Sequence, residues 1–571
     1  ETHTASANRL YRLDEEKQLR FQLGYIHDRT TRQYGSEEIY YFAQDTVHTA
    51  TNRHDRLKTD CLNAEVNYED NTVSRYTREN FSFAGTWKSG VSDITGDNAI
   101  FQKIKNSQWE LKNYFNQLYT KEKYTWGIRS YIRYTHCPAS LTVAHRNLPI
   151  LFADNMLIAN CIYHRNELSS SDNISENTYR TVIGQTHESI LAEYEEMNTG
   201  NAYTDNALYG MRKINGVNYQ LTGGFCGELS SVKQENAYSA HSYSFYTVPR
   251  IEWERNDFLF TAATTVRWSH LPKQSYSRFC VSPFFCFRYK FTPRWKMSLL
   301  GSLDESEGGL KDIYPFRYRE DYRTVVKHTG KVPVTVRQLY TCYLEYKNTI
   351  KEFFWTLSAS YSHNRYNLIT ERNYKDGNFY LSSVERNHSS HSYTLNTIGS
   401  KGIYDWNLKT SLELTLARNE GKQLNEGIVQ DYRYDYLCIE PKIVWAPSVF
   451  FEAEYKATVS CVGGGIGEDT SLDPLWEVAQ RLTLSLEFHD TEFRLSGEHF
   501  YNDLSKNQHL NIWLADVSLI HKAGKWRFAA SAINLFNKEQ YRYTLYSAVQ
   551  SYTSWIKLRP REFMVSVQYQ W

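Results

Sequence analysis

Apolar and polar residues alternate with a period of two along most of this chain. Residues 406–416 place Trp406 and the leucines at 408, 412, 414 and 416 on one face, with Lys409 and Glu413 on the other. Segments 19–25 and 482–488 repeat the pattern. A β-strand with one apolar and one polar face produces this period, whereas an amphipathic helix does not. The sequence therefore predicts an all-β protein.

The connections between these segments alternate between short and long. Asn215-Gly216 is the clearest short one, since Asn-Gly is the strongest hairpin signal. The other short turns lie at 70–71, 120–122, 255–257, 292–293, 348–349, 401–402, 446–448, 489–491 and 522–524. Long polar connections separate them, among them 30–54, 137–206, 304–337, 365–388, 462–476 and 537–560. Ten hairpins plus a first strand (17–28) and a last strand (561–571) predict an up-and-down antiparallel barrel of about 22 strands, an even number that lets the ends meet.

The width of such a barrel decides which solvent its apolar face meets. Side chains cannot fill the interior of a barrel of about 22 strands, so an apolar lumen would be an empty hole. The apolar faces are short and tipped with Tyr or Trp, as in a membrane band with aromatic girdles. The 45 tyrosines and 14 tryptophans suit such girdles. We therefore predict a transmembrane β-barrel. A net charge of +1 gives no signal for nucleic acid.

The chain ends on the alternating stretch "REFMVSVQYQW", Arg561 to Trp571. One face of this predicted strand carries Phe563, Val565, Val567, Tyr569 and Trp571. We expect it to pair with the first strand and close the barrel. A C-terminal aromatic residue on such a strand resembles the insertion signal of bacterial outer-membrane proteins, which the barrel-assembly machinery reads. In the alternative interpretation, Trp571 is one more girdle residue.

The C-terminal region resembles TonB-dependent outer-membrane receptors of the Bacteroidetes type. The motifs are Asn534-Leu535-Phe536-Asn537, then "LRPRE" (Leu558 to Glu562), with further likeness at 278–303 and 312–324. The resemblance covers the whole chain. It implies a bacterial outer-membrane location among lipid and lipopolysaccharide, with short periplasmic turns and long extracellular loops. It also implies TonB-driven import of a scarce nutrient: a metal chelate, vitamin, oligosaccharide or peptide. A surface lipoprotein partner would accompany a glycan importer, although the barrel is short for that branch.

One part of the family pattern is missing. Family members carry an N-terminal plug domain of well over a hundred residues and a TonB-binding segment, and residues 1–16 are too few for either. We expect residues 1–16 to be a lead-in, residues 17–571 to be the barrel, and this sequence to be part of a longer chain that would bring the plug and TonB as partners. The alternative is a passive pore or a structural barrel scaffold in an outer-membrane complex.

The sequence carries no catalytic or nucleotide-binding motif, so we predict neither an enzyme nor a cofactor. The glycine run 463–467 lacks the G-x-G-x-x-G spacing and reads as a flexible loop. His388 and His391 could share a metal only with further ligands, and the acidic stretch 467–473 is a solvated loop unless it holds Ca²⁺. We predict no metal site from these patterns.

Recognition is expected in the long loops, because rigid scaffolds carry binding residues there. The loop 137–206 should fold over the mouth or against a plug. Loop 304–337 has an aromatic and arginine cluster suited to planar or anionic ligands, namely Tyr314, Phe316, Arg317, Tyr318, Arg319, Tyr322 and Arg323. In the alternative interpretation, these residues pack on a neighbouring loop at the mouth.

Overall fold

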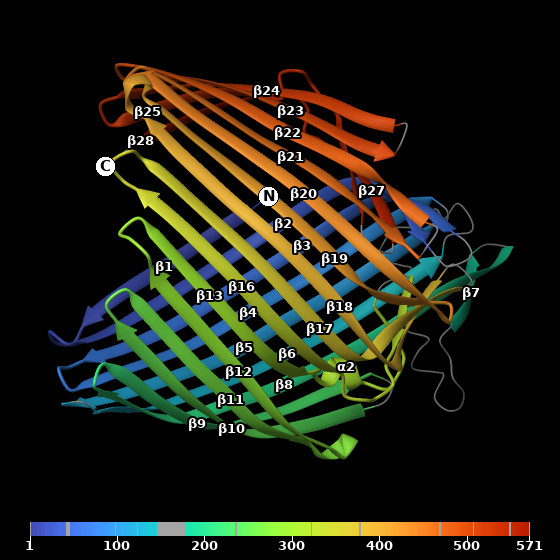
Figure 1. The fold of residues 1–571 in the computed structure, drawn as a ribbon. Coiled ribbons are helices and arrows are strands. Elements are labelled where there is room, and N and C mark those ends of the chain that lie inside the picture. The colour runs from blue at the N-terminus through green and yellow to red at the C-terminus, as the bar shows by residue number, and fades with distance from the viewer. Residues whose placement is uncertain are drawn as a thin grey trace.

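A single sheet, curled on itself, contains every strand of the computed structural model (Figure 1). The structure describes residues 2–41, 46–96, 99–122, 124–145, 177–183, 186–234, 237–320, 323–375, 378–467, 470–505, 508–546 and 550–569. Among these residues, no helix is long and apolar enough to cross a membrane.

The strands of the sheet pair in antiparallel fashion almost throughout. They are β1 (Thr2–Arg12), β2 (Lys17–Tyr41), β3 (Thr46–Asn71), β4 (Arg75–Gly96), β5 (Ile100–Lys121), β6 (Tyr124–His145), β7 (Asn177–Ile183), β8 (Thr186–Ile214), β9 (Val217–Lys233), β10 (Ala237–Arg255), β11 (Phe258–Leu271), β12 (Tyr276–Lys290), β13 (Trp295–Glu307), β14 (Tyr318–Arg319), β15 (Thr324–Lys327), β16 (Val334–Asn348), β17 (Phe353–Lys375), β18 (Asn378–Ile403), β19 (Leu408–Asn425), β20 (Ile428–Ser448), β21 (Phe451–Ile466), β22 (Thr470–Phe488), β23 (Thr491–Ser505), β24 (Gln508–Ala523), β25 (Trp526–Ile533), β26 (Gln540–Tyr546), β27 (Gln550–Lys557) and β28 (Glu562–Tyr569). Helix α2 (Leu310–Ile313) and the 3₁₀ turns η2 (Pro272–Gln274) and η3 (Tyr404–Trp406) lie between them.

The predicted up-and-down antiparallel architecture is confirmed. The five strands β2–β6, the six strands β8–β13, the ten strands β16–β25 and β28 form one meander of 22 in all. The described sheet has 28 strands because β1, β7, the loop strands β14 and β15, and the hairpin β26–β27 add to that meander.

The short turns lie at one end of the barrel, which we call the turn end; we call the other end the mouth. Asn215 and Gly216 make the β8–β9 turn with φ angles of 48° and 83°, the left-handed pair that a two-residue hairpin favours. The other predicted turns fall within a few residues of the observed ones. The largest displacement is at β18–β19, which turns through η3.

The strands are much longer than their apolar faces. The predicted connection 30–54 belongs largely to the β2–β3 hairpin, which is paired as far as Tyr41 and Thr46. Likewise, residues 137–145 extend β6 and residues 186–206 belong to β8, whereas 146–176 lie outside the described residues. In residues 29–38 of β2 and 46–56 of β3 both faces are largely polar, so the alternation that reveals a strand disappears from the sequence there.

The predicted flexible loop at the glycine run is also wrong. Gly463, Gly464 and Gly465 belong to β21 and pair with β20. A Cβ at Gly464 would overlap the main-chain carbonyl oxygen of Arg433 on β20, at a point where the β21–β22 register shifts. The glycine therefore allows two backbones to approach closely in a strand.

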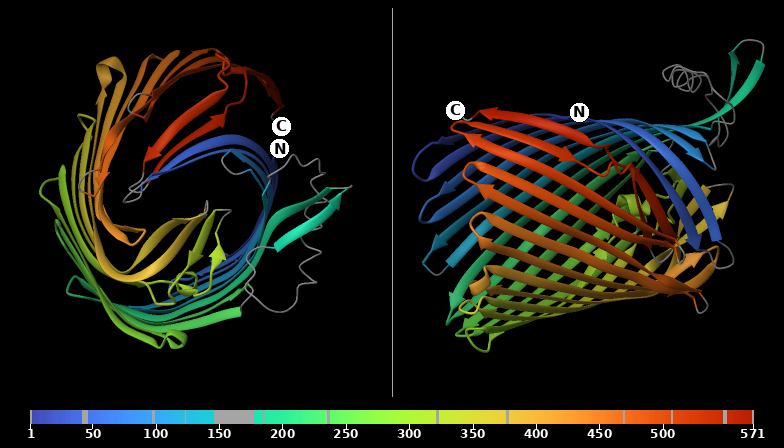
Figure 2. Two further views of the ribbon diagram at one scale, coloured as in Figure 1. Left: turned by 90° about the vertical axis from the view of Figure 1, so that its right-hand side faces the viewer. Right: turned by 90° about the horizontal axis from the view of Figure 1, so that it is seen from above.

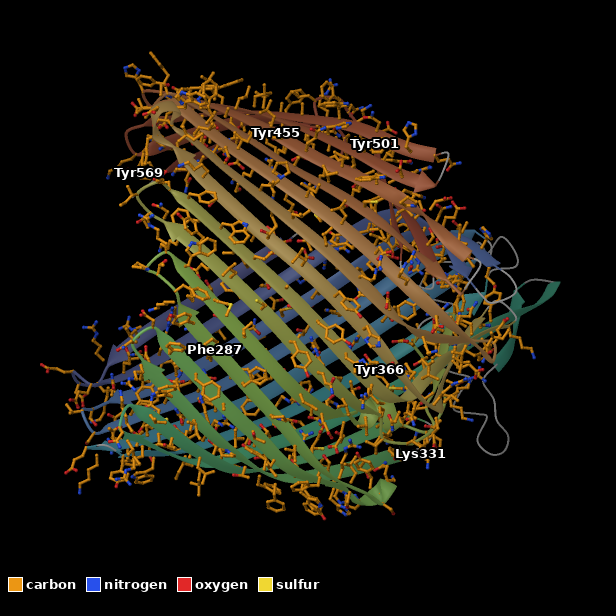
Figure 3. The ribbon with its side chains drawn as sticks, in the orientation of Figure 1. Phe287, Lys331, Tyr366, Tyr455, Tyr501 and Tyr569 are labelled. Atoms are coloured by element: carbon orange, nitrogen blue, oxygen red, sulfur yellow. The ribbon has the colours of Figure 1, made fainter. Side chains whose placement is uncertain are left out.

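Apolar side chains point outward and polar ones inward. One outward row crosses four neighbouring strands and contains Leu23, Ala64, Phe83 and Leu111. Leu23 is among the many large hydrophobic residues left exposed. Phe287, Tyr455 and Tyr569, labelled in Figure 3, lie in the half of the barrel that carries the short turns.

Charged and amide side chains bond to one another across the inner face. Arg278 Nη2 donates to Glu305 Oε2 at 2.8 Å. Tyr246 Oη donates to Asp205 Oδ1 at 2.6 Å, and Arg129 reaches the same carboxylate at 3.3 Å. At these places the lumen wall is polar and its charged groups are paired with one another.

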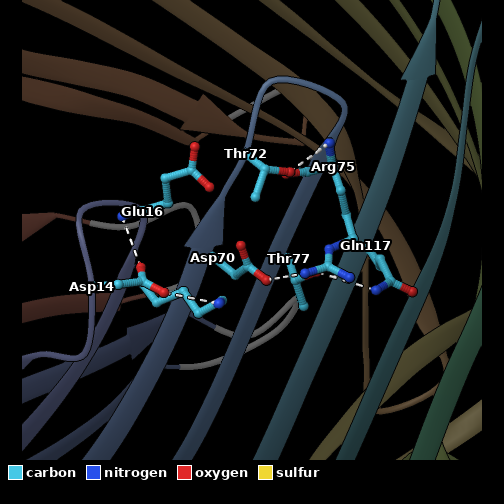
Figure 4. A network of polar contacts seen from close by, with 8 residues as sticks. Asp14, Glu16, Asp70, Thr72, Arg75, Thr77 and Gln117 are labelled. Carbon is cyan, nitrogen blue, oxygen red and sulfur yellow. Dashed lines mark hydrogen bonds and ion pairs between the residues drawn. The ribbon is translucent and has the colours of Figure 1, made fainter.

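A polar network holds neighbouring short turns in place (Figure 4). Arg75 Nη2 forms an ion pair with the nearly buried carboxylate of Asp70. Thr72 Oγ1 donates to the Arg75 carbonyl oxygen at 2.9 Å, and the Asn71 amide donates to the Glu16 carbonyl oxygen at 2.9 Å. The last bond joins the β3–β4 turn to the β1–β2 turn.

The two ends of the sheet differ from the expectation. Residues 2–12, expected within a lead-in, form β1, which pairs with the turn-end half of β2 from Gln18 to Asp28. Their small and polar residues give little alternation to predict it from. The terminal strand β28 pairs with β25, and no pairing between β28 and either β1 or β2 occurs among the described residues. At the mouth, β27 pairs with β2 from Tyr34 to Tyr40.

Strand direction decides which edge can accept β28. Strands β1 and β28 both run toward the turn end, so they could meet only in parallel, whereas β2 and β28 are antiparallel. The outward face of β28 is bare, with Phe563 76% and Val565 81% exposed; Trp571 lies outside the described residues. Barrel closure by β28 thus remains a prediction, because β1 occupies the edge of β2 that β28 would use. The residues predicted to close the barrel are Phe563, Val565, Val567, Tyr569 and Trp571.

We expect β28 to displace β1 from β2 in a lipid bilayer, because unpaired backbone groups in lipid cost several kcal/mol each. Leu23→Cys would then cross-link with a cysteine at Phe563, Val565 or Val567. The comparison pair is Leu23→Cys with Ala7→Cys, which face each other across β1 and β2. Mass spectrometry of oxidised protein identifies the bridge. Exclusive bridging to Ala7→Cys in the bilayer would contradict the expectation.

Candidate functional site: the mouth of the barrel

Residues 308–333, which we call the insert, connect β13 to β16 at the mouth. The left view of Figure 2 shows this yellow-green segment inside the ring of strands. The insert is attached to the wall by β15, which pairs in parallel with β18 from Thr324↔Phe379 to Lys327↔Ser382. In addition, the Phe379 amide donates to the Arg323 carbonyl oxygen at 2.7 Å. The insert therefore continues the sheet into the lumen.

A small apolar cluster anchors the first half of the insert. Ile313 and Val332 pack with Ala240 and Leu271 from the wall. The Tyr314 side chain is 2% exposed, and its hydroxyl donates to Gln234 Oε1 at 3.0 Å. The rings of Phe316 and Tyr318 lie 5.5 and 6.1 Å from that of Tyr314. Burial raises the pKa of the Tyr318 phenol.

A buried ion pair anchors the second half. Arg323 Nη2 lies 3.3 Å from Glu38 Oε2 on β2, and the two side chains are 10% and 11% exposed. The Tyr40 hydroxyl also donates to Glu38, and its ring lies 4.3 Å from that of Phe379. Burial, then the bond to Glu38, raise the pKa of Tyr40 well above its usual range. Tyr40 therefore stays a neutral donor at physiological pH.

The structure separates the predicted cluster into two groups. Tyr314, Phe316, Tyr318 and Arg323 make the packing contacts described above, as the alternative interpretation expected. Arg317 is exposed, with its guanidinium carbon 5.3 Å from the centre of the Tyr380 ring. Arg319 Nη1 donates to Asn378 Oδ1 at 3.3 Å. Tyr322 lies outside the described residues. Ligand contact by this cluster stays a prediction.

Three residues of the mouth had no local signal in the sequence. Glu38, Tyr40 and Arg372 fall in segments predicted only as polar connections. Arg372 lies with its guanidinium carbon 5.9 Å from the centre of the Tyr40 ring, and burial lowers its pKa. The tip of the β17–β18 hairpin brings Arg372 and Phe379 to β2, across the ring (Figure 2). Contacts between residues more than 280 positions apart leave no spacing pattern to read.

The other candidate ligands make separate contacts. His388 stacks on Tyr366, with ring centres 4.8 Å apart, whereas His391 stacks on His363 at 4.4 Å. Among the described residues, no group of three or more His, Cys, Asp and Glu side chains could hold a metal ion. In the acidic stretch 467–473, residues 468 and 469 lie outside the described residues.

No protein-family model and no curated protein matches the chain. Among solved structures, the chain is similar to the outer membrane transporter YddB from Escherichia coli at 10% identity, covering 96% of this chain and 75% of that chain, with a TM-score of 0.48. It is also similar to the ferric yersiniabactin uptake receptor FyuA from Yersinia pestis, at 9% identity, covering 98% of this chain and 78% of that chain, with a TM-score of 0.46. A third similar structure is a mutant of the ferric enterobactin receptor PfeA from Pseudomonas aeruginosa, at 10% identity, covering 98% of this chain and 80% of that chain, with a TM-score of 0.45. All these TM-scores are below 0.5, so the proposals below rest on the geometry of this chain.

We expect Arg323→Ala to release the insert, because removing one partner of a buried ion pair leaves an uncompensated charge and costs about 3–5 kcal/mol. The control is Lys331→Ala, whose partner is Glu385 at 3.4 Å; these side chains are 64% and 61% exposed, so the loss should be about 0–1 kcal/mol. Lys331 is labelled in Figure 3. Amide hydrogen exchange of residues 323–333 measures the difference. Equal exchange in both variants would show that the ion pair does not hold the insert.

Proposed function

We propose that this chain is the barrel of a bacterial outer-membrane transporter that imports a scarce nutrient through a gated mouth. The observation that carries the proposal is the combination of an outward apolar band with a lumen entrance that the insert occupies. The short turns then face the periplasm and the mouth faces outward. The proposal includes two more specific statements, namely that TonB drives the transport and that the protein comes from the Bacteroidetes.

The height of the apolar band supports a membrane location. On β19 the outward face is apolar from Leu408 to Leu416 except for Thr410, and the next outward residue is Arg418. At a rise of about 3.3 Å per residue and a tilt near 40°, this stretch spans roughly 20 Å, close to the band of an outer-membrane barrel.

Aromatic pairs lie at both margins of the band. At the turn end, the rings of Tyr119 and Trp126 stack at 4.5 Å. Toward the mouth, His499 and Trp513 stack at 4.3 Å. Tyr and Trp gather where the headgroups of a bilayer meet its hydrocarbon, and paired girdles favour a spanning barrel over a soluble one.

The obstructed entrance favours an importer over an open pore. The insert and the β17–β18 tip both reach the lumen, and the insert is held by a buried ion pair rather than by loose contacts. A passive pore gains nothing from such an obstruction, whereas a transporter needs its entrance closed between cargoes. Arg317 and Arg319, on the half-exposed side of the insert, suit an anionic or planar cargo.

Conductance distinguishes an importer barrel from a pore. In planar bilayers we expect the wild-type barrel to conduct little, and a variant lacking residues 310–331 to conduct several-fold more. In cells, the intact gene should support uptake of one member of a panel of metal chelates, vitamins, oligosaccharides and peptides, with loss of uptake when TonB is deleted. If the wild-type conductance is high and the deletion leaves it unchanged, and if uptake does not depend on TonB, the proposal is overturned in favour of a passive pore.

A further inference from the structure

Strands β2 to β5 carry a cluster of cations on their outward face, just beyond the apolar band. Two adjacent cross-strand rows contain it. One row is Arg29, Lys58, Ser89 and Lys105; the next row toward the mouth is Thr31, Arg56, Val91 and Lys103. Neighbouring strands lie about 4.8 Å apart, and successive rows about 6.6 Å apart. Five cationic side chains therefore share one small surface, which we call the cationic field.

The field sits where an aromatic margin ends. The rows on its turn-end side contain Tyr25, Leu62 and Trp109, followed by His27, Asp60 and Trp87. Moving toward the mouth, the outward face changes from apolar to aromatic to cationic within about four residues of strand. This is the order of chemistry that a bilayer presents from its hydrocarbon to its headgroups.

The two lysines of β5, Lys103 and Lys105, differ from Lys58 in their ion pairing. Asp60, in the row below, accepts from His27 at 2.6 Å and pairs with Lys58 at 3.3 Å. Asp93 lies one row closer to the mouth than Val91, and Glu196 lies two strands beyond Lys105. No ion pair of the described residues includes Lys103 or Lys105.

Another sector of the same outward belt is arranged differently. On β19 and β20, Arg418 and Arg433 both pair with Asp435, at 2.6 and 3.0 Å, and Lys422 pairs with Asp431 at 3.1 Å. There each cation has an anionic partner within the protein. The β5 lysines Lys103 and Lys105 thus differ from the cations of the β19–β20 sector, because no ion pair of the described residues includes them.

Resting on the proposed outer-membrane location, we propose that the cationic field binds phosphate groups of glycolipid headgroups in the outer leaflet. Lys and Arg bind phosphate by charge-assisted hydrogen bonds, and several of them spread over two rows fit a headgroup with more than one phosphate. Lysine at this depth can extend its ammonium toward the headgroups while its stem stays on the apolar margin. The occupant is a lipid because the field continues directly from the apolar band, where acyl chains would lie.

The test compares a phosphorylated outer-membrane glycolipid with the same lipid after enzymatic dephosphorylation, each added to the detergent-solubilised barrel. Native mass spectrometry counts bound lipids. We expect wild type to prefer the phosphorylated lipid by at least about tenfold, and Lys103→Gln/Lys105→Gln to lose most of that preference, because each charge-assisted bond weakens binding when removed.

The control is Arg418→Gln/Lys422→Gln, which removes the same charge from the β19–β20 sector and should leave the preference within about twofold of wild type. Heat-modifiable migration on a gel shows that each variant folds; if the double variant does not, Lys105→Gln alone replaces it. Equal binding of both lipids by wild type, or an equal loss in the control, would overturn the inference. So would displacement by inorganic phosphate alone, or preference for an acidic polysaccharide. Failure of wild type to insert into bilayers would instead contradict the proposed function.

Discussion

Hydrogen bonding between neighbouring antiparallel strands is the interaction on which every other feature of this molecule depends. Each strand of the meander satisfies its backbone groups on the next strand, so the wall needs no conventional hydrophobic core. The side chains are then free to serve two environments, apolar outside and polar inside. One place where this pairing is incomplete is informative. Strand β28 has one partner, β25, among the described residues, while β1 covers the edge of β2 that an antiparallel closure requires.

The mouth uses the same pairing for a different purpose. β15 joins β18 in parallel, which brings the insert into the lumen without unpaired backbone. Besides this pairing, three kinds of contact hold it there: an apolar cluster that includes Ile313 and Val332, hydrogen bonds from Tyr314 and Arg319, and the buried ion pair between Arg323 and Glu38.

Much of the wall could be predicted because its signal is local. The strand face at 406–416 and the turn at Asn215-Gly216 are visible in a few residues, since alternation and left-handed turn geometry are properties of short segments. The strand extensions near the mouth could not be predicted in this way. Residues 30–54 have no apolar face, and β1 has almost none, so neither shows the alternation on which the prediction depended. The glycines of β21 were misread because their role is to let β20 approach, which is a tertiary requirement.

The candidate site shows the same division. The sequence by itself determined an all-β meander of 22 strands with an outward apolar band, because period-two alternation and turn chemistry act within each hairpin. It also located the aromatic and arginine cluster of the insert. Only the tertiary structure decided which of those residues pack and which face the entrance, and only it brought Glu38, Tyr40 and Arg372 to the insert. It likewise gathered Arg29, Arg56, Lys58, Lys103 and Lys105 into one surface. The physical reason is that side chains on different strands become neighbours through strand register, which the curled sheet sets and no single segment encodes.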